Sequence, residues 1–276
     1  MSDDKGAPVM SGLIVHEESH DDPIGTIATP YRDHMTTETH ISMVRTDYRW
    51  ADGRPINRLF IQGSQLPLQR NEAVMRMKGD WLLMIDDDMV FAKDVIGALV
   101  STYHQLKETV KEPFMVGALC VRRYEPYQPT LFKAVDPQKG PFNFLEDWEG
   151  ADIVEVDATG AAFVLVEEDV FSAVMGGPLP SYDERLQLKP WPFFEWVGTM
   201  GEDLRFCMKA RNAGCRVFVD TRIRIGHVGQ KVYDITDFWH AVAERPKEIE
   251  DARVELNDSM GLPTLKAEEA RGRLDF

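Results

Sequence analysis

The sequence has few cysteines and no long apolar run, and both shortages exclude classes of protein. Only three of 276 residues are cysteine, none stands in a CxxC spacing, and the odd number leaves at least one unpaired. This usage is typical of a reducing compartment, where cysteines serve as small buried side chains. The best apolar stretches, residues 81–85 and 161–166, are far shorter than the ~20 residues of a membrane-spanning helix. The N-terminus shows no secretory signal pattern, so we expect a cytoplasmic protein without a transmembrane segment.

Basic residues and glycine-rich phosphate loops are also scarce. Lys and Arg number 31 against 46 Asp and Glu, which gives a formal net charge of −15. Binding along a nucleic-acid backbone requires clustered basic residues, so nucleic acid is a disfavoured partner, although a local basic groove stays compatible with this composition. Neither GxxxxGK[ST] nor GxGxxG occurs, so nothing indicates a P-loop or dinucleotide-binding Rossmann enzyme. The remaining composition, 43% hydrophobic and 28% charged, is typical of a globular protein.

Short apolar segments alternate with amphipathic ones along the chain. In the first half the pattern predicts strands at 25–29, 59–61, 81–85 and 114–121, and helices at 37–48, 67–79 and 95–106. In the less regular second half it predicts strands at 153–156, 161–166 and 216–219, and helices at 168–175 and 204–213. This alternation indicates an α/β fold with a mostly parallel sheet and helices on both faces. Residues 1–22 are expected to form an acidic flexible tail, and residues 241–276 a charged helix and tail.

Three consecutive carboxylates follow the most apolar expected strand. Asp86, Asp87 and Asp88 come directly after residues 81–85. Ligands of open α/β sheets bind at the carboxyl ends of strands, and adjacent carboxylates repel one another unless a cation lies nearby. Alternation directs Asp86 and Asp88 to one side, where both can address one Mg²⁺ or Mn²⁺ ion whose other ligands are water and phosphate oxygens. The alternative interpretation is an acidic surface turn.

Other candidate residues are ambiguous when taken singly. Glu202 and Asp203 open an amphipathic helix, where they either complement the helix dipole or supply a general base at a pocket edge. His227 follows an expected strand and is either a structural histidine or a metal ligand. The aromatic stretch at 191–196 is either a wall on which a sugar stacks or a hydrophobic plug under a long loop.

The order of these segments resembles the GT-A class of nucleotide-sugar glycosyltransferases, especially the large family 2-like group. The resemblance covers residues 25–232 and is carried by "IATPYRD", "RNEAV", "GDWLLMIDDDMVF", "GEDLRFCMKARNAGCRVFVD" and "IGHVG". It implies a metal-dependent transfer of a sugar from a nucleotide-sugar donor, with UDP- or GDP-sugars favoured, to a hydroxyl of a glycan, protein or small molecule. It also implies one GT-A domain at 23–240, with a nucleotide-binding half at about 23–121 and an acceptor half at about 122–240.

The resemblance implies metal and catalytic roles for particular residues. Asp86 and Asp88 take the places of the DxD aspartates, which bind Mn²⁺ or Mg²⁺ and approach the nucleotide ribose, with Asp87 between them in the donor site. His227 takes the place of a histidine that completes the metal site. Asp203 corresponds to the catalytic base of inverting members, with Glu202 beside it at the acceptor edge. In a retaining enzyme Asp203 would position the acceptor instead.

Further donor contacts are implied by the resemblance. Pro30, Tyr31 and Arg32 follow the first strand, where the family binds the nucleotide, and Arg70 matches a basic position near the donor. At the end of the second strand Gln62 stands where family members usually have an acidic residue, so the choice of nucleotide stays open.

Two competing interpretations are less well supported. A nucleotidyltransferase that makes sugar nucleotides requires a Gly-rich phosphate loop after the first strand, whereas residues 28–33 read ATPYRD. A catalytically inactive glycosyltransferase-like module would serve binding or structure. The presence of Asp86, Asp88, Asp203 and His227 argues against such a decayed site.

Overall fold

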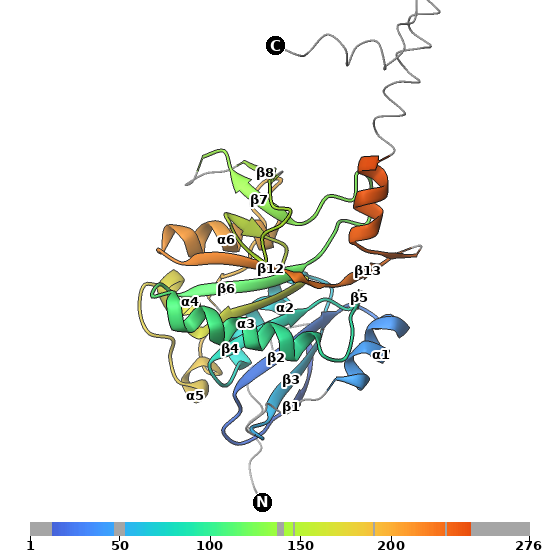
Figure 1. The fold of residues 1–276 in the computed structure, drawn as a ribbon. Coiled ribbons are helices and arrows are strands. Elements are labelled where there is room, and N and C mark those ends of the chain that lie inside the picture. The colour runs from blue at the N-terminus through green and yellow to red at the C-terminus, as the bar shows by residue number, and fades with distance from the viewer. Residues whose placement is uncertain are drawn as a thin grey trace, which may run out of the picture.

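Eight strands form one large sheet in the computed structural model of this chain, with helices on both of its faces (Figure 1). The structure describes residues 13–46, 53–136, 141–145, 147–189, 191–229 and 231–243. In chain order the strands of this sheet are β1 (Ile14–Glu18), β2 (Gly25–Tyr31), β3 (Ile56–Gln62), β4 (Trp81–Ile85), β6 (Phe114–Leu119), β9 (Ile153–Val156), β11 (Phe163–Glu167) and β12 (Arg216–Arg224). Across the sheet the order is β1-β3-β2-β4-β11-β6-β12-β9.

Five of these strands run in one direction, which confirms the predicted mostly parallel sheet. β3, β2 and β4 are parallel neighbours, and β6 and β12 form a second parallel pair. β11 runs antiparallel between β4 and β6, and β1 and β9 are antiparallel edge strands. Because β11 and β12 pair with strands from the first half of the chain, the two expected halves share one sheet.

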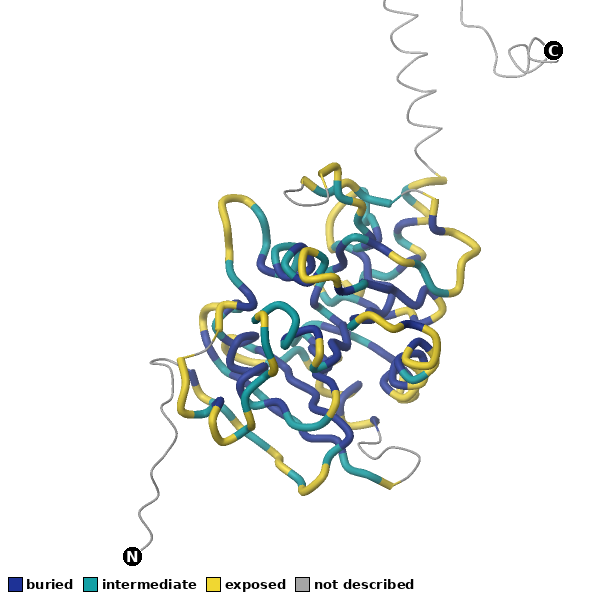
Figure 2. The backbone as a smooth tube through the Cα atoms, turned by 90° about the vertical axis from the view of Figure 1, so that its left-hand side faces the viewer, coloured by how far each residue is buried: buried dark blue, intermediate teal, exposed yellow. Residues whose placement is uncertain are grey.

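Alternating apolar side chains on the central strands supply two hydrophobic cores. Along β4 the side chains of Leu82 and Met84 join one core, and those of Trp81, Leu83 and Ile85 join the other. The first core packs under α2 (Leu66–Arg76), α4 (Glu168–Met175) and α6 (Glu202–Asn212), and the second under α1 (Thr37–Arg45) and α3 (Val95–Thr109). Figure 2 shows these buried segments running through the middle of the molecule. This confirms the expectation of helices on both faces.

Smaller elements complete the described part of the chain. β7 (Leu131–Ala134), β8 (Phe142–Phe144) and β10 (Ala158–Thr159) form one small sheet, and β5 (Met89–Val90), β13 (Gly226–Val228) and β14 (Val232–Tyr233) form another. The loop before α6 contains a short helix, α5 (Tyr182–Arg185). No helix among the described residues has the length and apolarity to cross a membrane. All three cysteines are buried and free of disulfides.

Several expected boundaries are wrong. Residues 14–18 belong to the segment predicted as a flexible tail, yet they form β1, antiparallel to β3. The strand expected to end before Pro30 continues to Tyr31, because beyond Ala28 only β3 flanks it and a missing N–H donor is tolerated. Helix α1 ends at Arg45, with Thr46 as its C-cap. The predicted end of that helix at residue 48, residues 1–12 and residues 244–276 lie outside the described chain.

Candidate active site

The segments that follow β4 and β6, the start of α6 and β13 meet at a cavity of about 220 Å³. Five predicted site residues line this cavity, namely Arg70, Asp86, Glu202, Asp203 and His227. They come from α2, from the turn after β4, from the start of α6 and from β13. The fold therefore brings together residues that lie up to 157 positions apart, as expected for the carboxyl edge of an α/β sheet.

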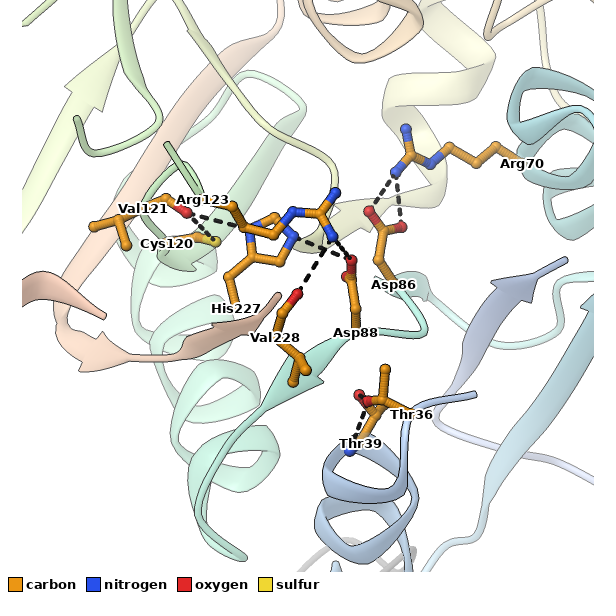
Figure 3. Close-up of polar contacts among 10 residues, drawn as sticks. All are labelled: Thr36, Thr39, Arg70, Asp86, Asp88, Cys120, Val121, Arg123, His227 and Val228. Atoms are coloured by element: carbon orange, nitrogen blue, oxygen red, sulfur yellow. Dashed lines mark hydrogen bonds and ion pairs between the residues drawn. The ribbon is translucent and has the colours of Figure 1, made fainter. Parts of the chain in front are cut away.

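A short strand pair places His227 beside Asp88. β5, which follows the three aspartates, pairs with β13, and the Val228 N–H donates to the Asp88 carbonyl over 2.7 Å. His227 Nε2 lies 3.3 Å from Asp88 Oδ2, and Nδ1 lies 3.2 Å from the carbonyl oxygen of Val121 (Figure 3). Burial opposes a charge on this imidazole, but hydrogen bonds to Asp88 and Cys120 outweigh it and raise the pKa of His227 to about 10.

Asp88 and His227 fit the requirements of a two-residue cation site. Adjacent ligands of a small divalent ion lie about 3 Å apart, which follows from bond lengths of ~2.0–2.2 Å and agrees with the spacing of these two groups. The Nδ1 hydrogen bond to Val121 fixes the ring, so that Nε2 remains directed at Asp88. Among the described residues no three His, Cys, Asp or Glu side chains are arranged to hold a metal ion. The predicted set of three ligands is thus assembled only in part.

Asp86 points away from that pair and toward Arg70 (Figure 3). Arg70 Nη2 donates to both Asp86 oxygens, over 2.8 and 3.1 Å, while Nη1 donates to Glu202. The Arg70 side chain is only 3% exposed. Burial opposes its charge, but Asp86, Glu202 and Asp203 raise the pKa of this guanidinium further. Arg70 lines the cavity with both terminal nitrogens bound to protein carboxylates, while its buried Nε has no hydrogen-bond partner within the part of the chain that the structure describes.

Glu202 is a buried link between Arg70 and the rim of the cavity. One of its oxygens accepts from Arg70, and the other accepts from Trp196 Nε1 over 2.6 Å. Both carboxylate oxygens are thus engaged, which favours a positioning role for Glu202 over proton transfer.

Asp203 differs from its neighbour because its carboxylate is half-buried and weakly engaged. Oδ1 accepts from the Leu204 N–H over 2.7 Å, and no ion pair to Asp203 forms within the described residues. Burial raises the pKa of Asp203, the charges of Glu202 and Asp86 add to this rise, and Arg70 opposes it. A carboxylate with a raised pKa that lines a cavity has the properties of a general base.

Gly201 provides the room that the Asp203 carboxylate occupies. The Gly201 backbone is extended, with φ −61° and ψ 155°, a conformation open to any residue. A Cβ atom at this position would lie 2.7 Å from Asp203 Oδ1. The carboxylate therefore folds back over the helix start, and only glycine accommodates this arrangement without a shift.

The aromatic stretch divides into a buried part and an exposed part. Phe193 and Phe194 are buried, and Asn71 on α2 holds the Phe194 backbone by two hydrogen bonds of 2.8 and 3.0 Å. Trp191 and Trp196 are 45% and 58% exposed. The plug interpretation therefore applies to the phenylalanines, whereas Trp196 is exposed beside Glu202 and the stacking of a sugar on it stays a prediction.

The predicted nucleotide-binding residues of the first two strands lie together, outside the lining of the cavity. Tyr31 pairs with Gln62 where β2 and β3 end, and Pro30 precedes Tyr31. Arg32 is exposed, with its Nε 3.8 Å from Asp33. The turn that follows joins the aspartate cluster, because the Thr36 N–H donates to the Asp87 carbonyl over 2.9 Å.

The surroundings of Asp87 disfavour its ionised form. Burial and the neighbouring charges of Asp88 and Asp86 raise its pKa to about 6. A backbone hydrogen bond from Arg32 opposes this rise, so Asp87 contacts the turn after β2 while Asp86 contacts Arg70 and Asp88 contacts His227.

Sequence reasoning missed a basic pair at the end of β6. Arg122 and Arg123 both line the cavity. Arg123 Nη1 lies 2.8 Å from Asp88 Oδ2, and the Arg122 guanidinium stacks over the Tyr124 ring at 3.8 Å. The sequence did contain a signal for this pair, because charged residues shortly after a buried strand are expected at the carboxyl edge of the sheet, as for the three aspartates.

Comparison with known proteins gives only distant structural likenesses. Neither a family model nor the sequence of a curated protein matches this chain. Similar solved structures include A197 from STIV, at 14% identity and a TM-score of 0.42, with 74% of this chain and 85% of that chain covered. They also include TarS from S. aureus, at 11% identity and a TM-score of 0.38, with 71% of this chain covered. The match spans only 36% of TarS. The functional argument therefore depends on the residues of the site.

Proposed function

We propose that this chain is a GT-A glycosyltransferase, which moves a sugar from a nucleotide-sugar donor to an acceptor hydroxyl with inversion and with Asp203 as the base. One observation carries the proposal. Asp203, a half-buried carboxylate of raised pKa, lines the same cavity as Asp86 and His227 at the carboxyl edge of the sheet. This arrangement supports a proton acceptor in the same cavity as the proposed donor-binding residues.

The donor side is formed by strand ends. Asp88 and His227 would hold Mn²⁺ or Mg²⁺, and the bound cation would neutralise the charge that develops on the departing diphosphate. Asp86 is fixed by Arg70 at the end of β4. Pro30, Tyr31, Arg32, Gln62 and Asp87 would contact the nucleoside where β2, β3 and β4 end, with the Gln62 amide available to a base edge.

The acceptor side is formed by the start of α6 and the loop before it. Asp203 would accept the proton of the attacking hydroxyl, which contributes a rate factor of ~10²–10⁴. Trp196 exposes its ring while its Nε1–H is fixed to Glu202, so a sugar ring can stack at this rim. Under a retaining mechanism the same Asp203 would orient the acceptor.

A thermal-shift panel of UDP-, GDP-, CDP- and dTDP-sugars, with and without Mn²⁺, tests the donor site. A ligand at ~100 times its dissociation constant adds about 2.7 kcal/mol. This raises the unfolding midpoint of a chain of this size by roughly 5–10 °C. The expected shift requires Mn²⁺ and one nucleotide, and it is lost in Asp88→Ala. If no nucleotide shifts the midpoint, the inactive binding module becomes the better interpretation.

Donor turnover tests the role of Asp203. In Asp203→Asn the thermal shift by donor should persist, while release of nucleoside diphosphate in the presence of acceptor falls to background. Asp169→Asn, at the exposed start of α4, is the matched control and should keep wild-type turnover. Equal turnover in Asp203→Asn and wild type would reject the assignment of the base.

A further inference from the structure

The side chains of Arg123 and His227 converge on one oxygen of Asp88. Arg123 Nη1 lies 2.8 Å from Asp88 Oδ2, and His227 Nε2 lies 3.3 Å from the same oxygen (Figure 3). The same Arg123 nitrogen is 3.3 Å from the carbonyl oxygen of Val228. Arg123 therefore contacts Asp88 and the β13 backbone while it lines the cavity.

Arg123 is the most accessible of these three groups. Its side chain is 47% exposed, whereas those of Asp88 and His227 are each 17% exposed. Its carbon chain crosses Gly229, where an added Cβ would lie 3.4 Å from Arg123 Cδ. Asp88 and His227 are fixed by the β5–β13 pairing, but Arg123 projects from the loop after β6. Movement of the guanidinium thus requires no change in the strands.

A guanidinium and a divalent cation cannot share this oxygen favourably. Like charges within a few ångströms repel one another strongly in a partly buried site. A guanidinium displaced from a carboxylate has a natural alternative in a phosphate, which offers the same pair of acceptors to its fork of N–H donors. Because Arg123 already lines the cavity, a diphosphate bound there would lie within its reach.

We infer that Arg123 is an exchangeable partner of Asp88, which neutralises this carboxylate in the donor-free protein and moves to the diphosphate when a divalent cation binds to Asp88 and His227. The inference rests on the proposed function for the identity of the diphosphate. It assigns to Arg123 a donor-binding role and explains how the site stays electrically balanced before the donor arrives.

Mn²⁺ binding without nucleotide tests whether Arg123 competes with the cation for Asp88. It can be measured on the full chain by electron paramagnetic resonance of the free ion. Arg123→Ala should bind Mn²⁺ on the order of tenfold more tightly than wild type, because the competing charge is gone. Arg123→Gln keeps a polar side chain at the same position and should show the same change. Arg216→Ala removes an exposed arginine paired with Glu155 at the opposite end of β12, and should leave Mn²⁺ affinity unchanged.

UDP binding at saturating Mn²⁺, measured by calorimetry, tests whether Arg123 binds the diphosphate. Arg123→Ala should bind UDP on the order of tenfold more weakly, since a charge-assisted phosphate contact is lost.

Unchanged or weaker Mn²⁺ binding in Arg123→Ala, or unchanged UDP binding, overturns the exchange. If no variant binds Mn²⁺ but a nucleotide sugar still binds, the exchange fails while glycosyl transfer survives. If Mn²⁺ binds as expected but no nucleotide does, the proposed function fails together with the diphosphate role.

Discussion

Asp203 is one of three carboxylates that surround a single buried guanidinium. One guanidinium, Arg70, faces three carboxylates, those of Asp86, Glu202 and Asp203. One guanidinium cannot balance three negative charges, so ionisation of Asp203 is unfavourable and its pKa is raised. Such a cost is common where a residue is retained for function and not for stability.

Asp203→Asn should stabilise the protein at neutral pH while it abolishes transfer. A carboxylate whose pKa rises on folding destabilises the fold once the pH exceeds the unfolded value of about 3.9. The gain from Asn should thus be absent below about pH 4 and grow as the pH rises above it. We expect a gain of about 1 kcal/mol, or roughly 2–4 °C in the midpoint at pH 7. Midpoints measured from pH 4 to 8 check this, and a less stable variant at pH 7 would contradict it.

Gly201→Ala should reduce activity without unfolding the protein. The new methyl would lie 2.7 Å from Asp203 Oδ1, so the carboxylate must turn away, whereas the backbone tolerates alanine. We expect turnover to fall by ~10- to 100-fold, the range for a catalytic group displaced by about 1 Å. Gly177→Ala, where an added methyl meets nothing within 4 Å, is the control. Equal turnover in the two variants would show that the position of Asp203 is unimportant.

At the scale of secondary-structure elements, the contact between α2 and α6 is buried and charged. Arg70 on α2 joins Glu202 on α6 to Asp86 after β4, and all three groups lie in or near the core. Loss of the central guanidinium would leave the Asp86 carboxylate and one oxygen of Glu202 without their cationic partner in a poorly solvated place.

Arg70→Met should therefore cost about 3–5 kcal/mol of unfolding free energy. Arg216→Met, which breaks an exposed ion pair with Glu155, should cost less than about 1 kcal/mol. Urea unfolding of both variants measures the difference. Similar values for the two would mean that the buried cluster adds nothing beyond an ordinary surface pair.

Sequence patterns predicted the elements whose signal is local. β4 and α4 have the predicted bounds, because a fully buried strand and a helix that ends at Gly176 are each visible within a short window. β1 was missed because its polar residues alternate between exposed and half-buried positions instead of forming an apolar face. The antiparallel direction of β11 depends on its neighbours β4 and β6, which no local pattern specifies.

The candidate site was predictable to the same extent. Asp86, Asp203 and His227 could be placed at one edge because strand ends and helix starts are local features, and all three line the cavity. The fold also brings Asp88 and His227 into contact, while the roles of these residues stay predictions. One of the two carboxylate partners of Arg70 is Glu202, 132 residues away, and this pairing is a product of tertiary structure. Arg123 was overlooked although it follows β6 as the aspartates follow β4.

For the whole molecule, the one large sheet shared by both halves of the described chain implies a single unfolding event. Each of the two cores draws side chains from both halves of the chain, and β11 joins β4 to β6. Neither half can then lose its structure while the other keeps its core.

Scanning calorimetry should show one transition whose calorimetric and van't Hoff enthalpies agree. A second, separable transition would contradict this and would indicate two independent units. Addition of Mn²⁺ and the donor that binds should move this one transition as a whole.

The position of β11 also governs how the protein can be made. β4 and β6 are synthesised well before residue 163, so on the ribosome each emerges with the edge that β11 will cover still open. Unpaired strand edges promote aggregation, and in the nascent chain the edges of β4 and β6 stay unpaired until β11 has been made. Closure of the sheet between β4 and β6 must therefore wait until β11 has been translated, and the cavity is complete only after α6 and His227 have followed.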